Sequence, residues 1–194
     1  MTVHVGGNIG IGVLALPAPV PGAVYVIEVS SYQLDLTTSF APDVAILTNI
    51  SPDHLERHGG MEGYVAAKAR IFAHAGEAII GVDDKWGAEI ARGVASTGTY
   101  AVAITGENGK EPIAVIGEQT IAYDAQNVRM AYGMIDLTEA RSLPGRHNAQ
   151  NAACAYAAAR GLGLDPTKTV EGLLTFPGLA HRMEEAGRLG RVRF

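Results

Sequence analysis

Short apolar runs that stop at polar residues set the pattern of the amino-terminal part of the chain. Residues 23–27 form a continuous, β-branched apolar run, which is typical of a strand buried on both faces of a parallel sheet. A second apolar run covers residues 44–47, and the polar residues 51–54 follow it as a strand-to-helix loop. Because ligands bind beyond the carboxyl ends of strands in open α/β sheets, Glu28 and His54 are both predicted at the ligand-binding edge.

Helical spacing appears further along the chain. Apolar residues recur at three- and four-residue intervals over residues 61–75 and predict a helix with one buried face, with Lys68 next to that face. Two more helices are predicted near residues 148–162 and over residues 166–174. Several short strands are expected between residues 100 and 137. The sequence therefore predicts an α/β fold, with a mostly parallel sheet flanked by helices and a small antiparallel β extension.

Composition fits one globular unit over residues 1–194, because 47% hydrophobic residues supply a core. The net charge of -5 argues against non-specific nucleic-acid binding, since no basic patch is present to displace counterions. No apolar run approaches membrane-spanning length and the start lacks the basic region of a signal peptide, so we expect no membrane insertion and a cytoplasmic location. The single cysteine, Cys154, is predicted to be a packed thiol in a reducing compartment. The oligomeric state is left open.

Three residues are candidates for chemistry, and each has a plainer alternative. Glu28 is placed to hold a cation, or it is a helix cap or surface acid. His54 is a ligand, or a capping and packing residue. Lys68 either extends to water or, beside a magnesium site, has a lowered pKa and reacts with carbon dioxide to give a metal-binding carbamate. Spacing alone does not decide between these alternatives.

Six motifs together resemble one family, the Mur ligases, which are ATP-dependent enzymes that add amino acids to the peptidoglycan precursor. The resemblance is to their central domain. The motifs are Gly6-Gly7-Asn8-Ile9-Gly10 and the segments 28–34, 48–55, 66–70, 145–152 and 178–184. After the serine pair at Ser30 and Ser31, this chain has Tyr32-Gln33, where the tripeptide-forming relatives usually carry a histidine. The sequence is therefore most similar to the D-glutamate-adding branch of the family.

The resemblance implies a set of catalytic and metal-binding residues. Glu28 and His54 are expected to be magnesium ligands, and Lys68 is expected to be a carbamylated lysine that supports the second of two Mg²⁺ ions. These three are the expected catalytic residues. For the asparagines at the start of the helix near residue 148, the alternative role is helix capping.

The same resemblance implies the substrate contacts. Asn8 is expected near the phosphates of the nucleotide substrate, and Gly7, Ser30 and Gln33 are expected to line the muramoyl-peptide site. The expected ATP contacts are Asn148 and Asn151 at the adenine and Arg182 near the phosphates.

The expected function is that of an ATP-dependent amide ligase, which adds D-glutamate to UDP-N-acetylmuramoyl-L-alanine in peptidoglycan biosynthesis. Residues 1–194 resemble a single partial central, ATP-binding domain. By this resemblance, we expect residues 1–194 to lack the phosphate loop that precedes the Gly6 motif in the family, together with the amino-terminal UDP-binding domain and the carboxyl-terminal domain. We therefore expect the isolated chain to have little or no activity. The alternatives are a folylpolyglutamate-synthase-like ligase and a non-catalytic remnant or binding module.

A second glycine-rich segment imitates the family's phosphate loop. Residues 105–110 read Thr-Gly-Glu-Asn-Gly-Lys, but the hydroxyl residue that should follow the lysine is missing. The next apolar run, residues 113–116, has the character of a strand, whereas a phosphate loop needs a following helix. A hairpin turn is the predicted structure here.

Overall fold

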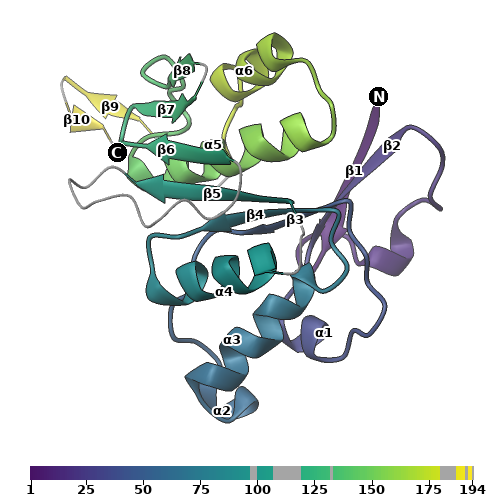
Figure 1. Ribbon diagram of the computed structural model, residues 1–194. Helices are drawn as coiled ribbons and strands as arrows, with labels where there is room; N and C mark the ends of the chain where they lie inside the picture. The colour runs from purple at the N-terminus through teal and green to yellow at the C-terminus, as the bar shows by residue number, and fades with distance from the viewer. Residues whose placement is uncertain (97–99, 107–118, 132, 180–186, 191, 194) are drawn as a thin grey trace. The chain divides into compact units, whose positions relative to one another are not determined.

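The computed structural model describes residues 1–96, 100–106, 119–131, 133–179, 187–190 and 192–193 (Figure 1). The chain divides into two compact units. Met1–Phe40 and Pro52–Ala73 make up unit 1, and Ala41–Ser51 and His74–Phe194 make up unit 2. In the described part of the chain, no helix combines the length and apolarity needed to cross a bilayer.

Unit 1 is built on two parallel strands. The strands β1 (Thr2–Gly7) and β2 (Ala23–Glu28) pair in register from Thr2 opposite Ala23 to Gly7 opposite Glu28, and the short 3₁₀ helix η1 (Val13–Ala15) lies between them in sequence. Three α-helices and a 3₁₀ turn complete the unit. They are α1 (Ser31–Asp35), α2 (Leu55–His58), α3 (Met61–Ala69) and η2 (Arg70–Phe72).

Arg70 joins two of these helices. Its Nε donates to the carbonyl of Leu34, in the last turn of α1, at 2.8 Å, and its Nη2 donates to that of Thr37, just beyond the helix, at 2.5 Å. The buried residues Leu34, Tyr64 and Phe72 lie in the same set of helices. The helix predicted over residues 61–75 is therefore present, although its last turn tightens into 3₁₀ geometry.

The strand predicted over residues 23–27 is confirmed as β2, but its burial on both faces is wrong. Val26 is 52% exposed, and within the described residues β2 is hydrogen-bonded only to β1. The second predicted strand, β3 (Val44–Leu47), belongs to a separate sheet. Glu28 and His54 nevertheless fall in the same compact unit, since His54 lies in the segment that returns to unit 1.

Unit 2 contains a six-stranded sheet in the order β3-β4-β5-β6-β7-β8. The first four strands pair in parallel and the last two pairings are antiparallel. Beyond β3, the strands are β4 (Glu77–Gly81), β5 (Tyr100–Gly106), β6 (Gln119–Tyr123), β7 (Asn127–Met130) and β8 (Gly133–Asp136). This arrangement confirms the predicted parallel sheet with an antiparallel extension.

Helices cover both faces of this sheet. The helix α4 (Lys85–Ser96) packs against β4 and β5, whereas α5 (Arg146–Gly161) runs across the strands on the other face (Figure 1). The helix α6 (Pro166–Leu174) packs on α5. Both helices predicted in this region are confirmed. Near the end of the chain, β9 (Arg188–Leu189) and β10 (Val192–Arg193) pair antiparallel.

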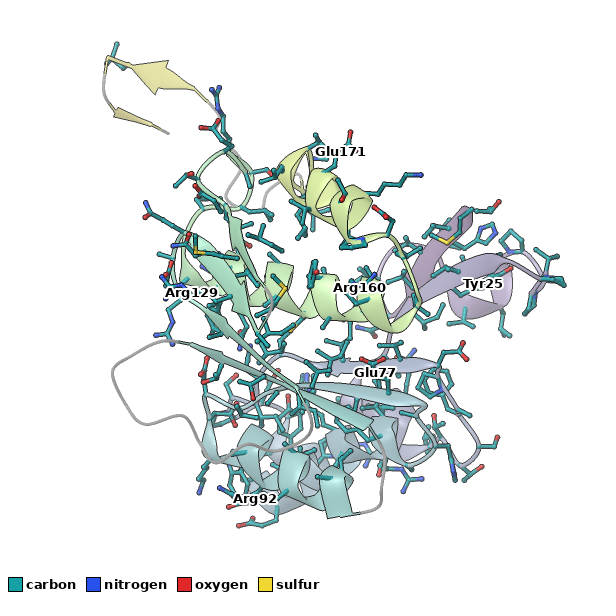
Figure 2. All side chains as sticks on the ribbon, turned by 45° about the horizontal axis from the view of Figure 1, so that its top comes forward. Tyr25, Glu77, Arg92, Arg129, Arg160 and Glu171 are labelled. Atoms are coloured by element: carbon teal, nitrogen blue, oxygen red, sulfur yellow. The ribbon has the colours of Figure 1, made fainter. Side chains whose placement is uncertain are left out.

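The core of unit 2 lies between α5 and the sheet, and its side chains fill this layer (Figure 2). The helix contributes mainly small residues, among them Ala149, Ala153 and Cys154, which let it approach the strands closely. Cys154 is buried as predicted, and burial raises the pKa of its thiol to about 12. The turn and strand predicted at residues 105–116 lie outside the described residues beyond Gly106.

We predict that Ile79→Ala lowers the free energy of unfolding by about 2–5 kcal/mol, because Ile79 is fully buried and its truncation leaves a cavity. Urea denaturation of the chain measures this loss. The matched control is Ile46→Ala, since Ile46 is the register partner of Ile79 but is 39% exposed. An equal loss in both variants would contradict the assignment of Ile79 to the core.

Candidate functional site

Three of the predicted site residues meet at the carboxyl end of the β1–β2 pair. Glu28 is the last residue of β2 and is exposed, and its carbonyl accepts a hydrogen bond from the Asn8 amide at 2.8 Å. Gly7 has φ 113°, and a Cβ on it would lie 2.2 Å from the Glu28 carbonyl oxygen. Only glycine therefore permits this approach. The structure brings Gly7, Asn8 and Glu28 together, while the ligand contacts assigned to them stay predictions.

Ser30 and Gln33 form a capping box at the start of α1. The Ser30 amide donates to Gln33 Oε1 at 2.8 Å, and the Gln33 amide donates to Ser30 Oγ at 3.3 Å. These bonds satisfy the first backbone N–H groups of the helix. The side-chain nitrogen of Gln33, Nε2, takes no part in the box. The Ser-x-x-Gln spacing is the sequence signal for a capping box. Resemblance to the family assigned both residues to the substrate site and did not predict this cap.

His54 has an unusual backbone conformation at the start of α2. With φ 51° and ψ 30°, it is the one residue other than glycine with positive φ in the described parts of the chain. Its amide donates to Asp53 Oδ1 at 2.9 Å, and its Nε2 lies 3.4 Å from Asp53 Oδ2. Its ring lies edge-on to Tyr32, with the ring centroids 5.1 Å apart. Left-handed conformations of this kind cluster at functional sites because the surroundings must stabilise them.

Lys68 lies half-buried on α3, with its Nζ 5.3 Å from the centroid of the Tyr64 ring. Burial lowers the pKa of Lys68, while the carboxylates of Asp53 and Glu28 act in the opposite direction. The pKa of Tyr64 is raised by burial and by Asp53. Lys68 is thus within electrostatic range of the acid predicted as a metal ligand, and its partial burial shifts its protonation equilibrium towards the neutral amine.

Aromatic and histidine side chains surround these residues, and sequence reasoning missed most of them. The His58 ring lies edge-on to Tyr32 and tilted against Tyr64, with centroids 5.7 and 5.6 Å away, and its Nε2 lies 3.0 Å from Ser31 Oγ. Arg57 lies over the Tyr32 ring and pairs with Asp35 at 3.0 Å. A pocket of about 350 Å³ adjoins this group. It is lined by Asp35, Arg57, His58, Gly63, Ala66, Ala67 and Arg70.

The donor set decides whether a metal fits. Across the residues that the structure describes, no group of three or more His, Cys, Asp or Glu side chains is placed to hold a metal ion. Glu28 would supply a carboxylate and His54 an imidazole nitrogen, so Mg²⁺ bound by this pair would need further oxygen donors. A carbamate on Lys68 would provide them. The predicted triad of Glu28, His54 and Lys68 stays a prediction that depends on this modification.

The predicted ATP contacts lie on α5 in unit 2. Asn148 Nδ2 donates to the carbonyl of Pro144 at 3.0 Å, and Asn151 is exposed on the next turn. The capping position of α5 is Gly145, which makes no side-chain cap bond, so neither asparagine is the N-cap. Arg182 lies outside the described residues, and its predicted role at the phosphates stays a prediction.

A polar cluster around Asp83 was not predicted. Asp83 Oδ1 accepts from the Gly106 amide at 2.7 Å and from Thr105 Oγ1 at 3.3 Å, while its Oδ2 accepts from the Tyr123 hydroxyl and lies 3.7 Å from Arg146 Nη2. Burial and Asp83 raise the pKa of Tyr123. The sequence signal was an acid just beyond an apolar run, the same pattern that singled out Glu28.

Comparison with known proteins gives one family. Residues 14–159 match the family model described as Mur ligase middle domain. The UDP-N-acetylmuramoylalanine--D-glutamate ligase of Caulobacter vibrioides (strain NA1000 / CB15N) is 53% identical over 194 residues, which cover 98% of this chain and 41% of that protein. The enzyme of the same name from Phenylobacterium zucineum (strain HLK1) is 52% identical, over 99% of this chain and 41% of that protein. The chain thus spans about two fifths of the length of these relatives.

Solved structures agree on the fold. MurF from Acinetobacter baumannii (crystal structure I) aligns with a TM-score of 0.57 and 24% identity, covering 87% of this chain and 37% of that chain. A pseudomurein peptide ligase type C from Methanothermus fervidus aligns with a TM-score of 0.59 and 22% identity, covering 84% of this chain and 41% of that chain. At these identities, the likeness confirms the predicted fold alone.

We predict that Ser30→Ala lowers the free energy of unfolding by about 0.5–2 kcal/mol, because it removes the capping oxygen of α1. Chemical denaturation measures the change. Ser39→Ala, at an exposed serine beyond the end of α1, is the control and should be close to neutral. If the two substitutions had the same effect, the capping box would make no net contribution to stability.

Proposed function

Since this chain belongs to the Mur ligase family through its middle domain, we propose that it is part of an ATP-dependent amide ligase that adds D-glutamate to UDP-N-acetylmuramoyl-L-alanine in peptidoglycan biosynthesis. The names of the most similar relatives support this substrate pair. The observation that carries the proposal is the meeting of Gly7, Asn8 and Glu28 at one strand end, in the unit that also holds His54 and Lys68.

The proposed reaction has two steps. The carboxylate of the muramoyl-peptide attacks the γ-phosphorus of ATP, which forms an acyl phosphate and releases ADP. The amine of D-glutamate then attacks the acyl carbon, so that the amide bond forms, the C–O bond to phosphate breaks and the amine loses a proton. In such phosphoryl transfers, the protein contributes mainly positioning and charge neutralisation.

The anionic groups of both substrates must come close together for this reaction. Two like charges about 4 Å apart repel by about 4 kcal/mol at an effective dielectric constant near 20. Mg²⁺, when bound, would offset this repulsion and polarise the phosphate oxygens. Glu28, His54 and a carbamate on Lys68 are the residues that would hold two such ions. The lowered pKa of Lys68 supports the carbamate, because only the neutral amine reacts with carbon dioxide.

The remaining residues are proposed as substrate contacts. Asn8 would lie near the phosphates of the nucleotide substrate, and Gly7, Ser30 and Gln33 would line the muramoyl-peptide site. The proposed ATP contacts are Asn148 and Asn151 at the adenine and Arg182 at the phosphates. Because the activated sugar nucleotide and ATP are both cytoplasmic metabolites, the proposed reaction takes place in the cytoplasm.

A chimeric ligase tests the proposed activity. The 194 residues of this chain replace the matching segment of the Caulobacter vibrioides enzyme, and phosphate release is measured with UDP-N-acetylmuramoyl-L-alanine and D-glutamate. We expect turnover that requires both substrates. Glu28→Gln, His54→Ala and Lys68→Ala should each reduce kcat by about 10²-fold or more, since each removes a group that positions the reacting phosphates. Lys168→Ala, at an exposed lysine on α6, is the matched control.

Other outcomes of this assay have definite meanings. Phosphate release with a folate in place of the muramoyl-peptide would favour the folylpolyglutamate-synthase-like alternative. A folded chimera that shows no turnover with either substrate would favour a binding module. The isolated chain should release no phosphate, and substrate-dependent release by it would contradict that expectation.

A separate experiment tests the Lys68 carbamate on the chain itself. In ¹³C-bicarbonate, we expect a carbamate carbon signal that Lys68→Ala removes and Lys168→Ala retains. Because burial lowers the pKa of Lys68, the neutral fraction of its amine, and with it the signal, should rise at a lower pH than for an ordinary lysine with a pKa near roughly 10.4. A signal of equal strength in the Lys68→Ala variant would rule out this site.

A further inference from the structure

Two polar side chains fasten the start of α5 to the sheet of unit 2. Gln150 is only 7% exposed, and its Nε2 donates to the carbonyl of Thr48, just beyond β3, at 2.9 Å. The contact passes over Gly81 at the end of β4. A Cβ on Gly81 would lie 1.8 Å from the Thr48 carbonyl oxygen and 3.0 Å from Gln150 Nε2. The absence of a side chain at Gly81 therefore makes room for this attachment.

The second attachment uses Arg146, one helical turn earlier. Its guanidinium lies directly against Gly106 at the end of β5, where a Cβ would be 1.9 Å from Nη2. Asp83 accepts from the Gly106 amide at 2.7 Å and faces the same guanidinium. Arg146 and Gln150 thus lie against glycines at the ends of the adjacent strands β5 and β4. Asp83 contacts both Gly106 and Arg146 at the first of these positions.

This geometry determines which way the rest of the helix points. Residues four apart lie on the same side of an α-helix, which turns by about 100° per residue. Arg146 and Gln150 therefore face the strand ends together, while Asn148 and Asn151 lie on other sides of the helix. Asn151 is accordingly exposed and Asn148 is half-buried.

Apolar packing alone would fix this orientation poorly. The helix meets the sheet mainly through alanines, such as Ala149, Ala152 and Ala153, whose small side chains offer little resistance to rotation or sliding. Hydrogen bonds are directional, so the bond from Gln150 to the Thr48 carbonyl restrains both the rotation and the axial position of the helix. The ion pair of Arg146 with Asp83, at 3.7 Å one turn earlier, adds a second restraint. A side chain that binds a planar ring through its amide needs this kind of support.

We infer that Gln150 and Asp83 are positioning residues, which fix the rotation and height of α5 so that Asn148 and Asn151 present their amides to the adenine ring of a bound nucleotide. The identity of the ligand rests on the proposed function, whereas the attachment of the helix does not. Neither residue touches the nucleotide in this inference, since both act through α5.

The test uses the ¹⁵N-labelled chain and two variants, Gln150→Leu and Asp83→Asn. Two properties are measured by NMR. They are amide hydrogen exchange in α5 and α6, and the affinity for adenosine from shifts of the Asn148 and Asn151 side-chain amides. The matched controls are Gln126→Leu and Asp43→Asn, which alter an exposed glutamine and an exposed aspartate of the same unit.

We expect each test variant to speed exchange over residues 146–153 and to weaken adenosine binding by about tenfold. Gln150→Leu removes the hydrogen bond to Thr48, and Asp83→Asn removes the charge that faces Arg146. Exchange in α6 and the two controls should not change. Unchanged exchange and affinity in both test variants would overturn the inference, and so would an equal acceleration in α6, which indicates general destabilisation. If the wild-type chain gives no adenosine response, the nucleotide role of the asparagines fails, while hydrogen exchange still decides whether these residues position α5.

Discussion

The close approach of backbone and side chains at the carboxyl ends of parallel strands is the constraint on which both units depend. In unit 1, Gly7 lets the backbone of β1 reach the Glu28 carbonyl, and in unit 2, Gly81 and Gly106 make room for groups from α5 and from the end of β3. A Cβ at any of these positions would overlap a neighbouring atom. Because parallel strands end at the same edge, these contacts place polar groups at the edge of the sheet where ligands bind. Glycine allows the groups to come close, because it has no Cβ.

Concentrating polar groups in a partly dry site requires that each has a partner, because an unsatisfied buried donor or acceptor costs about 1–3 kcal/mol. In unit 2, Asp83 accepts from Thr105 and Gly106 at the end of β5 and from the Tyr123 hydroxyl at the end of β6. In unit 1, the capping box of Ser30 and Gln33 supplies partners for backbone N–H groups at the start of α1. Such residues have two functions. Their hydrogen bonds stabilise the local fold, and the same bonds determine which of their polar atoms remain available to a substrate. Gln33 illustrates this, because its side-chain oxygen Oε1 accepts from the Ser30 amide while its side-chain nitrogen Nε2 takes no part in the capping box.

The sequence predicted the elements whose pattern is local. The β2 and β3 runs, the helix from Arg146 and the helix from Pro166 all appear where periodicity and glycine signals indicated. The exposure of Val26 and the contacts of Asp83 depend on which strands become neighbours, and pairing between distant segments leaves no trace in a short window. The contact of Arg70, just beyond the end of α3, with the Leu34 carbonyl 36 residues away is also invisible in a short window. Resemblance to family motifs singled out Gly7, Asn8 and Glu28, because such motifs reflect contacts between distant segments as well as the local pattern.

Burial and nearby carboxylates act in opposite directions on the charge of Lys68. A lysine meant to remain a cation would gain from water, yet this one is half-buried beside the Tyr64 ring, where its charge is disfavoured. The carboxylates of Asp53 and Glu28 favour the ammonium and so offset part of the lowering of the Lys68 pKa by burial. Conversion to a carbamate would reverse the sign of the charge and place it against the same two carboxylates. That arrangement is repulsive unless cations lie between them, so the modification and metal binding would each stabilise the other.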